Sequence, residues 1–265
     1  MYNFRFVMVF VLWLSSNPLA AQPYKIASHE KPLKENTQTM VQQTGWFYGA
    51  FLSHQSSYYK GIKNDTLALP VIGYKSYRFS FLGPRASYRL NDDKHVQASA
   101  LVVFKPIGFK ARDSKFLNGM STRRDSLFGG FNASIKQEKL SYKFSYLHDL
   151  QNRSRGQDIE LGASYFHNIG PFFITPNISL NYWDSAYTDY YFGVRDNESN
   201  SDRNTYKPSF AVNPSIGLNL ATPIFFKGFT RANFSHHWLG SSIHNSPIIE
   251  THRHWKMSIS FTRFF

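Results

Sequence analysis

Apolar and polar residues alternate along most of the chain, from Gly45 to Phe265, with a period of two. The stretch Phe210–Leu220 is the clearest example. One of its faces carries Phe210, Val212, Ile216, Leu218 and Leu220, and the other carries Ala211, Asn213, Ser215, Gly217 and Asn219. The stretches 140–150 and 174–182 repeat the pattern. Because successive side chains of a strand point to opposite faces, the alternation predicts strands with one apolar and one polar face.

Gly, Pro, Asn and Asp interrupt this alternation and divide it into about ten segments. The segments lie near residues 45–58, 69–90, 94–104, 126–137, 139–150, 157–168, 172–184, 208–221, 227–239 and 252–265. The second segment is long, and we expect a bend at Gly83-Pro84. The connections alternate between short and mostly longer ones, as in outer-membrane barrels. An even strand number follows, about ten, or about twelve if the bend is a turn.

A β-sandwich also alternates, but two details favour a transmembrane barrel. The polar face is rich in Ser, Asn, Gly and Thr, as a lumen would be, and aromatic residues lie towards segment ends, where interfacial girdles belong. These aromatic residues are Trp46, Tyr182, Trp238 and Trp255. Aromatic residues make up 17% of the chain, yet its mean hydropathy is −0.39, which disfavours helical spans of about 20 apolar residues. We therefore predict an all-β, antiparallel transmembrane β-barrel over residues 45–265.

The N-terminus resembles an export signal. Arg5 precedes an apolar run from Phe6 to Leu14, and small residues offer a cleavage site between Ala21 and Gln22. The run is too short to span a membrane comfortably, so a signal peptide over residues 1–21 is favoured over an anchor. Residues 22–44 are polar and lack a period, which predicts a flexible periplasmic lead-in, with a small helix or plug as the alternative. The expected location is the outer membrane of a Gram-negative cell, with both termini periplasmic.

The last predicted strand, 255–265, ends in an aromatic residue. Phe261 and Phe265 lie on its apolar face, and Phe265 resembles the C-terminal signal that the barrel-insertion machinery recognises. Arg263 interrupts this face near the expected periplasmic end, where a long basic side chain can reach the interface. A chance C-terminal Phe is the alternative interpretation.

Charge and cysteine content narrow the partners. The chain holds 30 Lys+Arg against 17 Asp+Glu, a formal net charge of +13, but the basic residues are scattered singly. We therefore expect no nucleic-acid partner, and favour anionic outer-membrane lipopolysaccharide and peptidoglycan. The chain has no cysteine, so neither a disulfide framework nor a thiolate metal site can form.

Catalytic and metal-binding candidates are weak. Ser235 and His237 share a polar face with Asn233, but same-face neighbours on a strand are about 7 Å apart, which we expect to be too far for a direct hydrogen bond. His252 and His254, with His244 in the preceding loop, could bind a divalent metal, although a hydrated rim is the simpler interpretation. We predict no enzyme activity, no metal site and no cofactor.

The segment 180–194, LNYWDSAYTDYYFGV, is more specific than the alternation. It resembles the hallmark of the MipA/OmpV family of outer-membrane proteins. The matching residues are Trp183, Asp184, Ser185, Tyr187, Asp189, Tyr190, Tyr191, Gly193 and Val194. Two other stretches, 58–61 and 243–248, are also similar to family positions, although Asn245 replaces the usual aspartate. The resemblance covers about residues 45–265 and is weakest between 95 and 160.

The resemblance implies a barrel and, for the best-known members, a non-catalytic scaffold between a murein hydrolase, such as a lytic transglycosylase, and a murein synthase. A narrow channel or small-solute-binding barrel is the alternative, and an outer-membrane hydrolase the third. In the hallmark loop, Tyr187, Tyr190 and Tyr191 offer rings that could stack on a sugar or partner, and Asp184 and Asp189 offer acceptors. The competing interpretation is that these residues lock the loop against the barrel wall.

Overall fold

The computed structural model describes residues 44–62, 64–93 and 95–265. The expected signal peptide (1–21), its cleavage site at Ala21 and Gln22, and all but the last residue of the segment 22–44 lie outside the described residues. These assignments therefore stay predictions.

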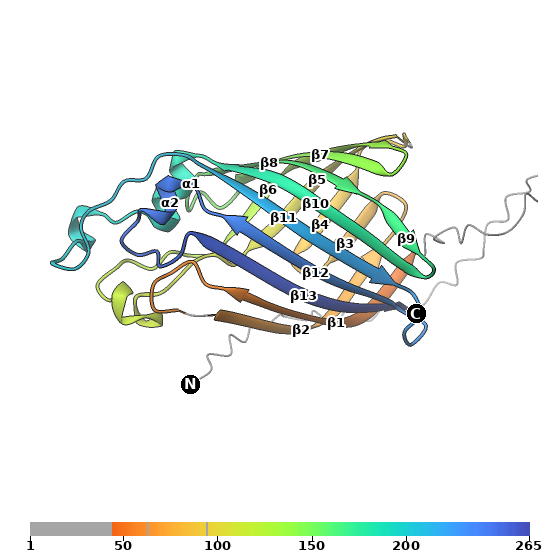
Figure 1. Ribbon diagram of the computed structural model, residues 1–265, viewed down its shortest axis with the longest axis horizontal. Coiled ribbons are helices and arrows are strands. Elements are labelled where there is room, and N and C mark those ends of the chain that lie inside the picture. The colour runs from red at the N-terminus through yellow and green to blue at the C-terminus, as the bar shows by residue number, and fades with distance from the viewer. Residues whose placement is uncertain (1–43, 63, 94) are drawn as a thin grey trace, which may run out of the picture. The chain divides into compact units, whose positions relative to one another are not determined.

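The described residues form one antiparallel sheet of thirteen strands. The strands are β1 (Gly45–Ser56), β2 (Asn64–Lys75), β3 (Phe79–Leu82), β4 (Arg85–Arg89), β5 (Val96–Lys105), β6 (Ser126–Gln137), β7 (Leu140–Asp149), β8 (Gln157–Tyr165), β9 (His167–Ile169), β10 (Phe172–Trp183), β11 (Ala211–Thr222), β12 (Phe229–Trp238) and β13 (Arg253–Phe264). The first strand pairs with the last, Phe47 opposite Phe264 and Gln55 opposite Lys256, so the sheet closes on itself (Figure 1). The predicted antiparallel barrel is confirmed.

The barrel has twelve strand positions rather than the expected ten. Strands β8 and β9 both pair with β10 and together occupy one position. The difference lies in the segment 69–90, which contains the end of β2 and all of β3 and β4. Leu82 pairs directly with Arg85, and Gly83 adopts a left-handed φ of 52°, so Gly83-Pro84 is a hairpin turn and not a bend. A second turn, at Ser76–Arg78, separates β2 from β3. The one expected segment thus holds three strands, and the twelve-strand alternative is correct.

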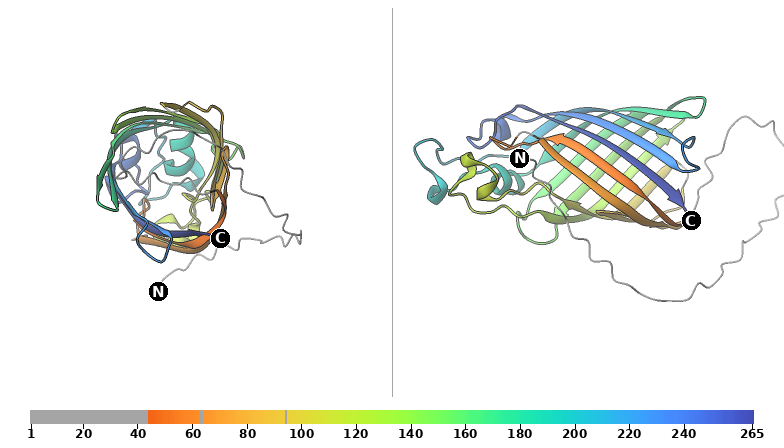
Figure 2. Two further views of the ribbon diagram at one scale, coloured as in Figure 1. Left: turned by 90° about the vertical axis from the view of Figure 1, so that its right-hand side faces the viewer. Right: turned by 90° about the horizontal axis from the view of Figure 1, so that it is seen from below.

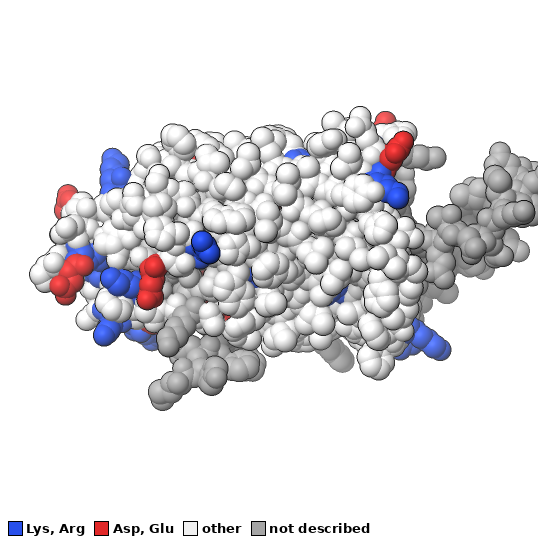
Figure 3. All heavy atoms as spheres, viewed as in Figure 1, with Lys and Arg blue, Asp and Glu red and all other residues white. Residues whose placement is uncertain are grey.

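The two faces of the wall are those that the alternation predicts. On the outside, Ile178 (61% exposed), Leu180 (50%) and Ile216 (47%) belong to an apolar belt. On the inside, Asn213 and Ser215 are buried. In Figure 3 the middle of the visible face is mainly uncharged, and charged side chains gather near the two ends. Such a belt suits the hydrocarbon of a membrane.

The barrel has two different ends. At the first, which we call the turn end, the connections are short and the C-terminus returns to β1, where Phe265 N–H donates to the Trp46 carbonyl (3.2 Å). At the other, the loop end, the connections 57–62, 106–125, 184–210 and 239–252 come together, and we call them the cap. The helices of these connections are α1 (Ser185–Phe192), α2 (Ser241–His244) and the 3₁₀ turns η1 (Ala111–Asp113), η2 (Lys115–Leu117) and η3 (Asp196–Glu198).

The cap lies across the mouth of the barrel. Viewed along the barrel, α1 and α2 fall inside the ring of strands (Figure 2). In the described part of the chain, no helix is long and apolar enough to cross a membrane.

Candidate functional site

The hallmark segment starts with a helix cap. Asp184 is the N-cap of α1, and its carboxylate accepts hydrogen bonds from the backbone N–H groups of Tyr187 (2.9 Å) and Gln157 (3.0 Å). The first bond satisfies a free donor of the first helical turn, and the second ties the helix to the start of β8. Asp184 therefore fixes the start of α1 next to the barrel wall.

A glycine ends the same helix. Gly193 N–H donates to the Asp189 carbonyl (3.0 Å), and a Cβ added at Gly193 would lie only 2.4 Å from that oxygen. The tight return of the chain thus leaves no space for a side chain. Asp189 itself is exposed at the surface of the cap.

The aromatic residues of the hallmark form the interior of the cap. Tyr187, Tyr191 and Phe192 are each no more than 1% exposed. The ring of Trp183, at the end of β10, packs on Tyr187 with centroids 4.9 Å apart. Burial raises the pKa values of Tyr187 and Tyr191 above the usual tyrosine value, so both hydroxyls stay protonated in the cap.

Three stretches that resemble the family meet in this interior. From the connection after β1, the Tyr59 hydroxyl lies 3.2 Å from the Tyr191 carbonyl and 2.9 Å from that of Ile107. From the connection after β12, the Ser246 hydroxyl donates to the Phe192 carbonyl (2.6 Å). Stretches far apart in the sequence therefore assemble one structural unit.

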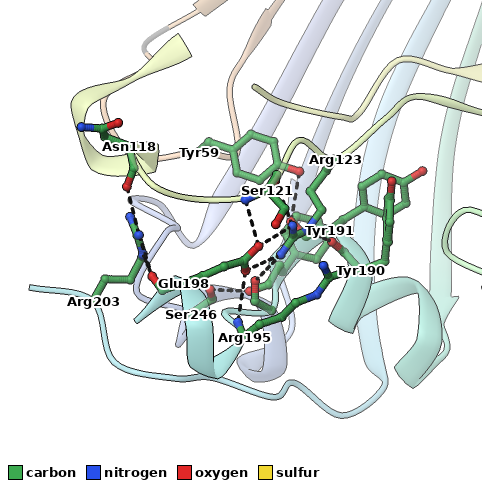
Figure 4. Close-up of polar contacts among 12 residues, drawn as sticks. Tyr59, Asn118, Ser121, Arg123, Tyr190, Tyr191, Arg195, Glu198, Arg203 and Ser246 are labelled. Carbon is green, nitrogen blue, oxygen red and sulfur yellow. Dashed lines mark hydrogen bonds and ion pairs between the residues drawn. The ribbon is translucent and has the colours of Figure 1, made fainter. Parts of the chain in front are cut away.

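A buried ion pair crosses the cap. The Arg123 guanidinium binds both carboxylate oxygens of Glu198, at 2.8 and 2.7 Å, and each side chain is only 1% exposed (Figure 4). Arg123 also donates to the carbonyls of Tyr190 (2.6 Å) and Ser121 (2.9 Å). The two-pronged geometry and the extra acceptors are what a buried pair needs to offset the loss of water.

The charge of Glu198 is well stabilised. Burial alone would raise its pKa, but the hydrogen bonds from Arg123 and from the backbone N–H groups of Arg195 and Ser121 outweigh burial and lower the pKa to about 2. Glu198 is therefore ionised at neutral pH.

A second buried arginine fastens the same loops. Arg203 is 5% exposed and donates to the carbonyls of Phe116, Asn118 and Glu198. Two guanidinium groups thus join the connections after β5 and after β10 through charge-assisted hydrogen bonds.

A comparison with known protein families matches a range of the chain that includes these stretches. The model of a protein family described as "MltA-interacting protein MipA" matches residues 48–265. The chain belongs to the MipA family. It is therefore an outer-membrane β-barrel, as the relatives' names also indicate.

Individual relatives within the MipA family are distant. Outer membrane protein OmpV of Vibrio cholerae is 25% identical over 202 residues, covering 75% of this chain and 78% of OmpV. The MltA-interacting protein of Escherichia coli is 23% identical, covering 72% and 79%. Omp26La of Vibrio anguillarum is 30% identical, but the match spans 56% of this chain and only 58% of Omp26La.

Solved barrels resemble the chain in outline. An outer membrane channel from Pseudomonas putida F1 has a TM-score of 0.42 and 7% identity, covering 88% of this chain and 100% of the channel. The NanC porin has a TM-score of 0.40 and 10% identity, covering 81% and 98%.

The hallmark residues of this chain differ in burial and in structural role. Trp183, Tyr187, Tyr191 and Gly193 belong to the interior, and Asp184 caps a helix. Tyr190 is half-buried, and its hydroxyl accepts a hydrogen bond from the Arg124 N–H (2.9 Å). The exposed members are Ser185 and Asp189. At the other end, Phe265 is 86% exposed and its ring contacts Tyr48 at 5.0 Å, and Phe261 lies on the outer face opposite Ala50.

The geometric objection to a Ser–His pair was wrong. His237 Nε2 lies 3.1 Å from Ser235 Oγ. The rise of a strand sets the spacing of the backbone, but an imidazole is long enough to lean along the strand and cover that spacing. In the lumen His237 also lies 5.9 Å from the ring of His254, which stacks on Tyr58 at 4.1 Å.

The three histidines considered as a metal site do not form one cluster. His244 and His252 pack with ring centroids 4.3 Å apart at the loop end, whereas His254 faces Tyr58 and Ser56 in the lumen. Over the described residues, no group of three or more His, Cys, Asp or Glu could hold a metal ion.

The sequence pattern does not single out the residues that lock the cap. Arg123, Glu198 and Arg203 lie in loops without period, and Arg123 and Glu198 are 75 residues apart. Nothing in the sequence singles out Glu198 and Arg203, because the stretch 195–203 holds five charged residues among Asn and Ser.

Proposed function

We propose that the protein is a non-catalytic scaffold in the outer membrane, with the cap outside the cell and the turn end in the periplasm, where it contacts murein-remodelling enzymes such as a lytic transglycosylase. A family described as MltA-interacting supports the class of partner. The observation that carries the proposal is the cap.

A channel needs a continuous water-filled path, and the packed interior of the cap argues against such a path. Its interior is a packed cluster that includes Tyr59, Tyr191 and Ile243, each at most 4% exposed. The buried pair of Arg123 and Glu198 joins two of its loops. A barrel closed in this way works through its surfaces more readily than through its lumen.

The turn end offers a surface suited to a protein partner. In the turn between β11 and β12, Ile224, Phe225 and Phe226 are 49%, 46% and 81% exposed. Phe226 and Lys227 both adopt left-handed backbone angles, with φ of 53° and 54°. For residues other than glycine this costs about 1–2 kcal/mol each, and strain of this kind is concentrated at functional sites. Exposed aromatic side chains are typical anchors of protein interfaces.

Binding of a small solute in the lumen is the second candidate. Lys143 Nζ lies 2.8 Å from a Glu160 carboxylate oxygen, and Lys105 pairs with Asp158, all on the inner face of the wall. Together with Ser, Asn and His side chains, these groups could hold a polar molecule below the cap.

Site-directed crosslinking tests the scaffold proposal. The chain has no cysteine, so a Phe226→Cys variant carries a single attachment point for a photoactivatable crosslinker at the turn end. We expect it to capture a murein hydrolase or synthase from envelopes, identified by mass spectrometry. The matched control is Asp202→Cys, an exposed position in the cap, which should capture neither. Capture from Asp202 alone, or from neither position, would contradict the proposal.

A further inference from the structure

Three cationic side chains belong to the barrel wall close to its turn end. Lys75 and Arg89 are the last residues of β2 and β4, and Arg231 is the third residue of β12. Strands β2 and β4 run towards the turn end, and β12 starts from it. The three residues therefore surround the opening of the barrel that lies opposite the cap, and Figure 2 (left) looks into the barrel from this end.

The register of the strands places all three side chains on the lumen face. Side chains two residues apart on a strand share a face. Each cation shares its face with an inward residue: Lys75 with Val71 (8% exposed), Arg231 with His237, and Arg89 with Ser87, which pairs opposite Leu101 (4% exposed). The three positive charges thus point into the barrel and not into the membrane.

These charges are close together and lack an acidic partner. Lys75 lies within electrostatic reach of both Arg89 and Arg231. Over residues 44–62, 64–93 and 95–265, no ion pair joins any of the three to a carboxylate. The guanidinium of Arg231 lies over the ring of Phe229 (4.5 Å), and that of Arg89 over Tyr77 (5.5 Å). Such contacts use the face of the guanidinium and leave its N–H edge for another partner.

The acidic side chains of the strands lie towards the loop end instead. Asp65 is the second residue of β2, Asp158 and Glu160 are the second and fourth of β8, and Asp149 ends β7. At the turn end, Asp92 pairs with Arg78, and Asp93 accepts hydrogen bonds from backbone N–H groups of its own turn. In the described part of the chain, the wall therefore supplies carboxylates to lysines near the cap but none to the three cations.

Solvent reaches the cluster of Lys75, Arg89 and Arg231. Arg231 is exposed although its side chain is on the lumen face, and the other two are half-buried. Like charges that lie close together repel each other, and a cavity lined by one sign of charge concentrates the field. A solute with several negative charges removes this repulsion, whereas a single negative charge neutralises only part of the cluster.

We propose that this cluster binds one multivalent oxyanion, a small molecule with several carboxylate or phosphate groups that enters from the turn end. Both groups present paired oxygens to the N–H edge of a guanidinium. The proposal goes beyond the scaffold function and does not depend on it, because no partner enzyme takes part. The site is also separate from the ion pairs below the cap.

Isothermal titration calorimetry of the full-length mature barrel tests the proposal. The barrel is held in nanodiscs of phosphatidylcholine, which has no net charge, at low ionic strength. We expect citrate or tripolyphosphate to bind one molecule per barrel, at least about tenfold more tightly than acetate. The tighter of the two identifies the preferred group. Added salt should weaken binding, since charges that water reaches are screened. Binding of neither anion, or of acetate as tightly, would overturn the proposal.

A pair of double variants locates the site. Lys75→Gln/Arg231→Gln should weaken binding of the preferred anion about tenfold or more, equivalent to at least ~1.4 kcal/mol. The charge-matched control, Arg112→Gln/Lys207→Gln, changes exposed residues of the cap and should bind as the wild type does. Equal affinities of the two double variants would show that the anion binds elsewhere or without a defined site.

A substitution beside Arg231 tests the cluster without removing any cation. Ser260 of β13 pairs directly opposite Arg231 and shares its lumen face. Ser260→Glu gives Arg231 a carboxylate neighbour, which should compete with the anion and weaken its binding as strongly as the double variant does. Ser260→Gln has nearly the same size without the charge and should keep most of the affinity. Equal binding by the glutamate and glutamine variants would exclude Arg231 from the site.

Discussion

Arg123 and Glu198 decide the stability of the cap at the scale of single residues. Neither charge reaches water, and each is the other's main partner. Replacing one of them leaves a charge buried without a counter-ion, a loss of about 3–5 kcal/mol in comparable pairs.

We therefore predict that Arg123→Ala lowers the free energy of opening of the cap by about 3–5 kcal/mol. Amide hydrogen exchange at Val194 and Tyr206, whose backbones bond to each other, measures this energy locally. The control is Arg124→Ala, because the neighbouring side chain is exposed, and its effect should stay within about 0.5 kcal/mol. Equal exchange in the two variants would show that the ion pair is not what holds the cap.

Glu198 also predicts how the cap responds to acid. Its pKa is lowered to about 2 in the folded cap, from an ordinary value of 4.5. A lowered carboxyl pKa stabilises the fold above the ordinary pKa, and this contribution disappears as the pH falls towards the folded value. The free energy of opening of the cap, obtained from exchange rates corrected for the intrinsic rate at each pH, should thus fall between about pH 4.5 and 2. This decrease should be absent in Glu198→Gln, and an identical acid response in this variant would contradict the role of Glu198.

At the scale of elements, the sequence predicted what local periodicity controls. The inner and outer faces of β7, β10 and β11 follow directly from alternation. The error at residues 69–90 concerned two turns. Gly83-Pro84 was interpreted as a bend, and the turn Ser76–Arg78 carries neither Gly nor Pro and is closed instead by hydrogen bonds between Ser76 and Phe79. The cap could not be derived, because its contacts join loops that are distant in sequence and follow no period.

The helix α1 offers a test at this scale. Because a Cβ at Gly193 would lie 2.4 Å from the Asp189 carbonyl, Gly193→Ala must displace the end of α1. We expect a loss of about 1–3 kcal/mol in cap stability, measured by hydrogen exchange or thermal unfolding. Gly162→Ala is the matched control, since its Cβ would meet no atom closer than 3.4 Å. Equal effects at both positions would refute the tight return at Gly193.

At the scale of the whole molecule, the barrel combines a polar lumen, an apolar belt and a closed loop end. The inner wall carries charged side chains such as Lys143 and Glu160, and the packed cap covers its loop end. The packing of the cap is a physical property of this chain's own loops.

Single-channel recording in planar bilayers tests this closure most directly. We expect the mature wild-type barrel to show no resolved openings at neutral pH. An Arg123→Ala/Glu198→Ala variant, which removes the ion pair from the cap, should show brief openings. Steady openings of the wild-type barrel, equal in size to those of the variant, would contradict the closed cap and favour a channel.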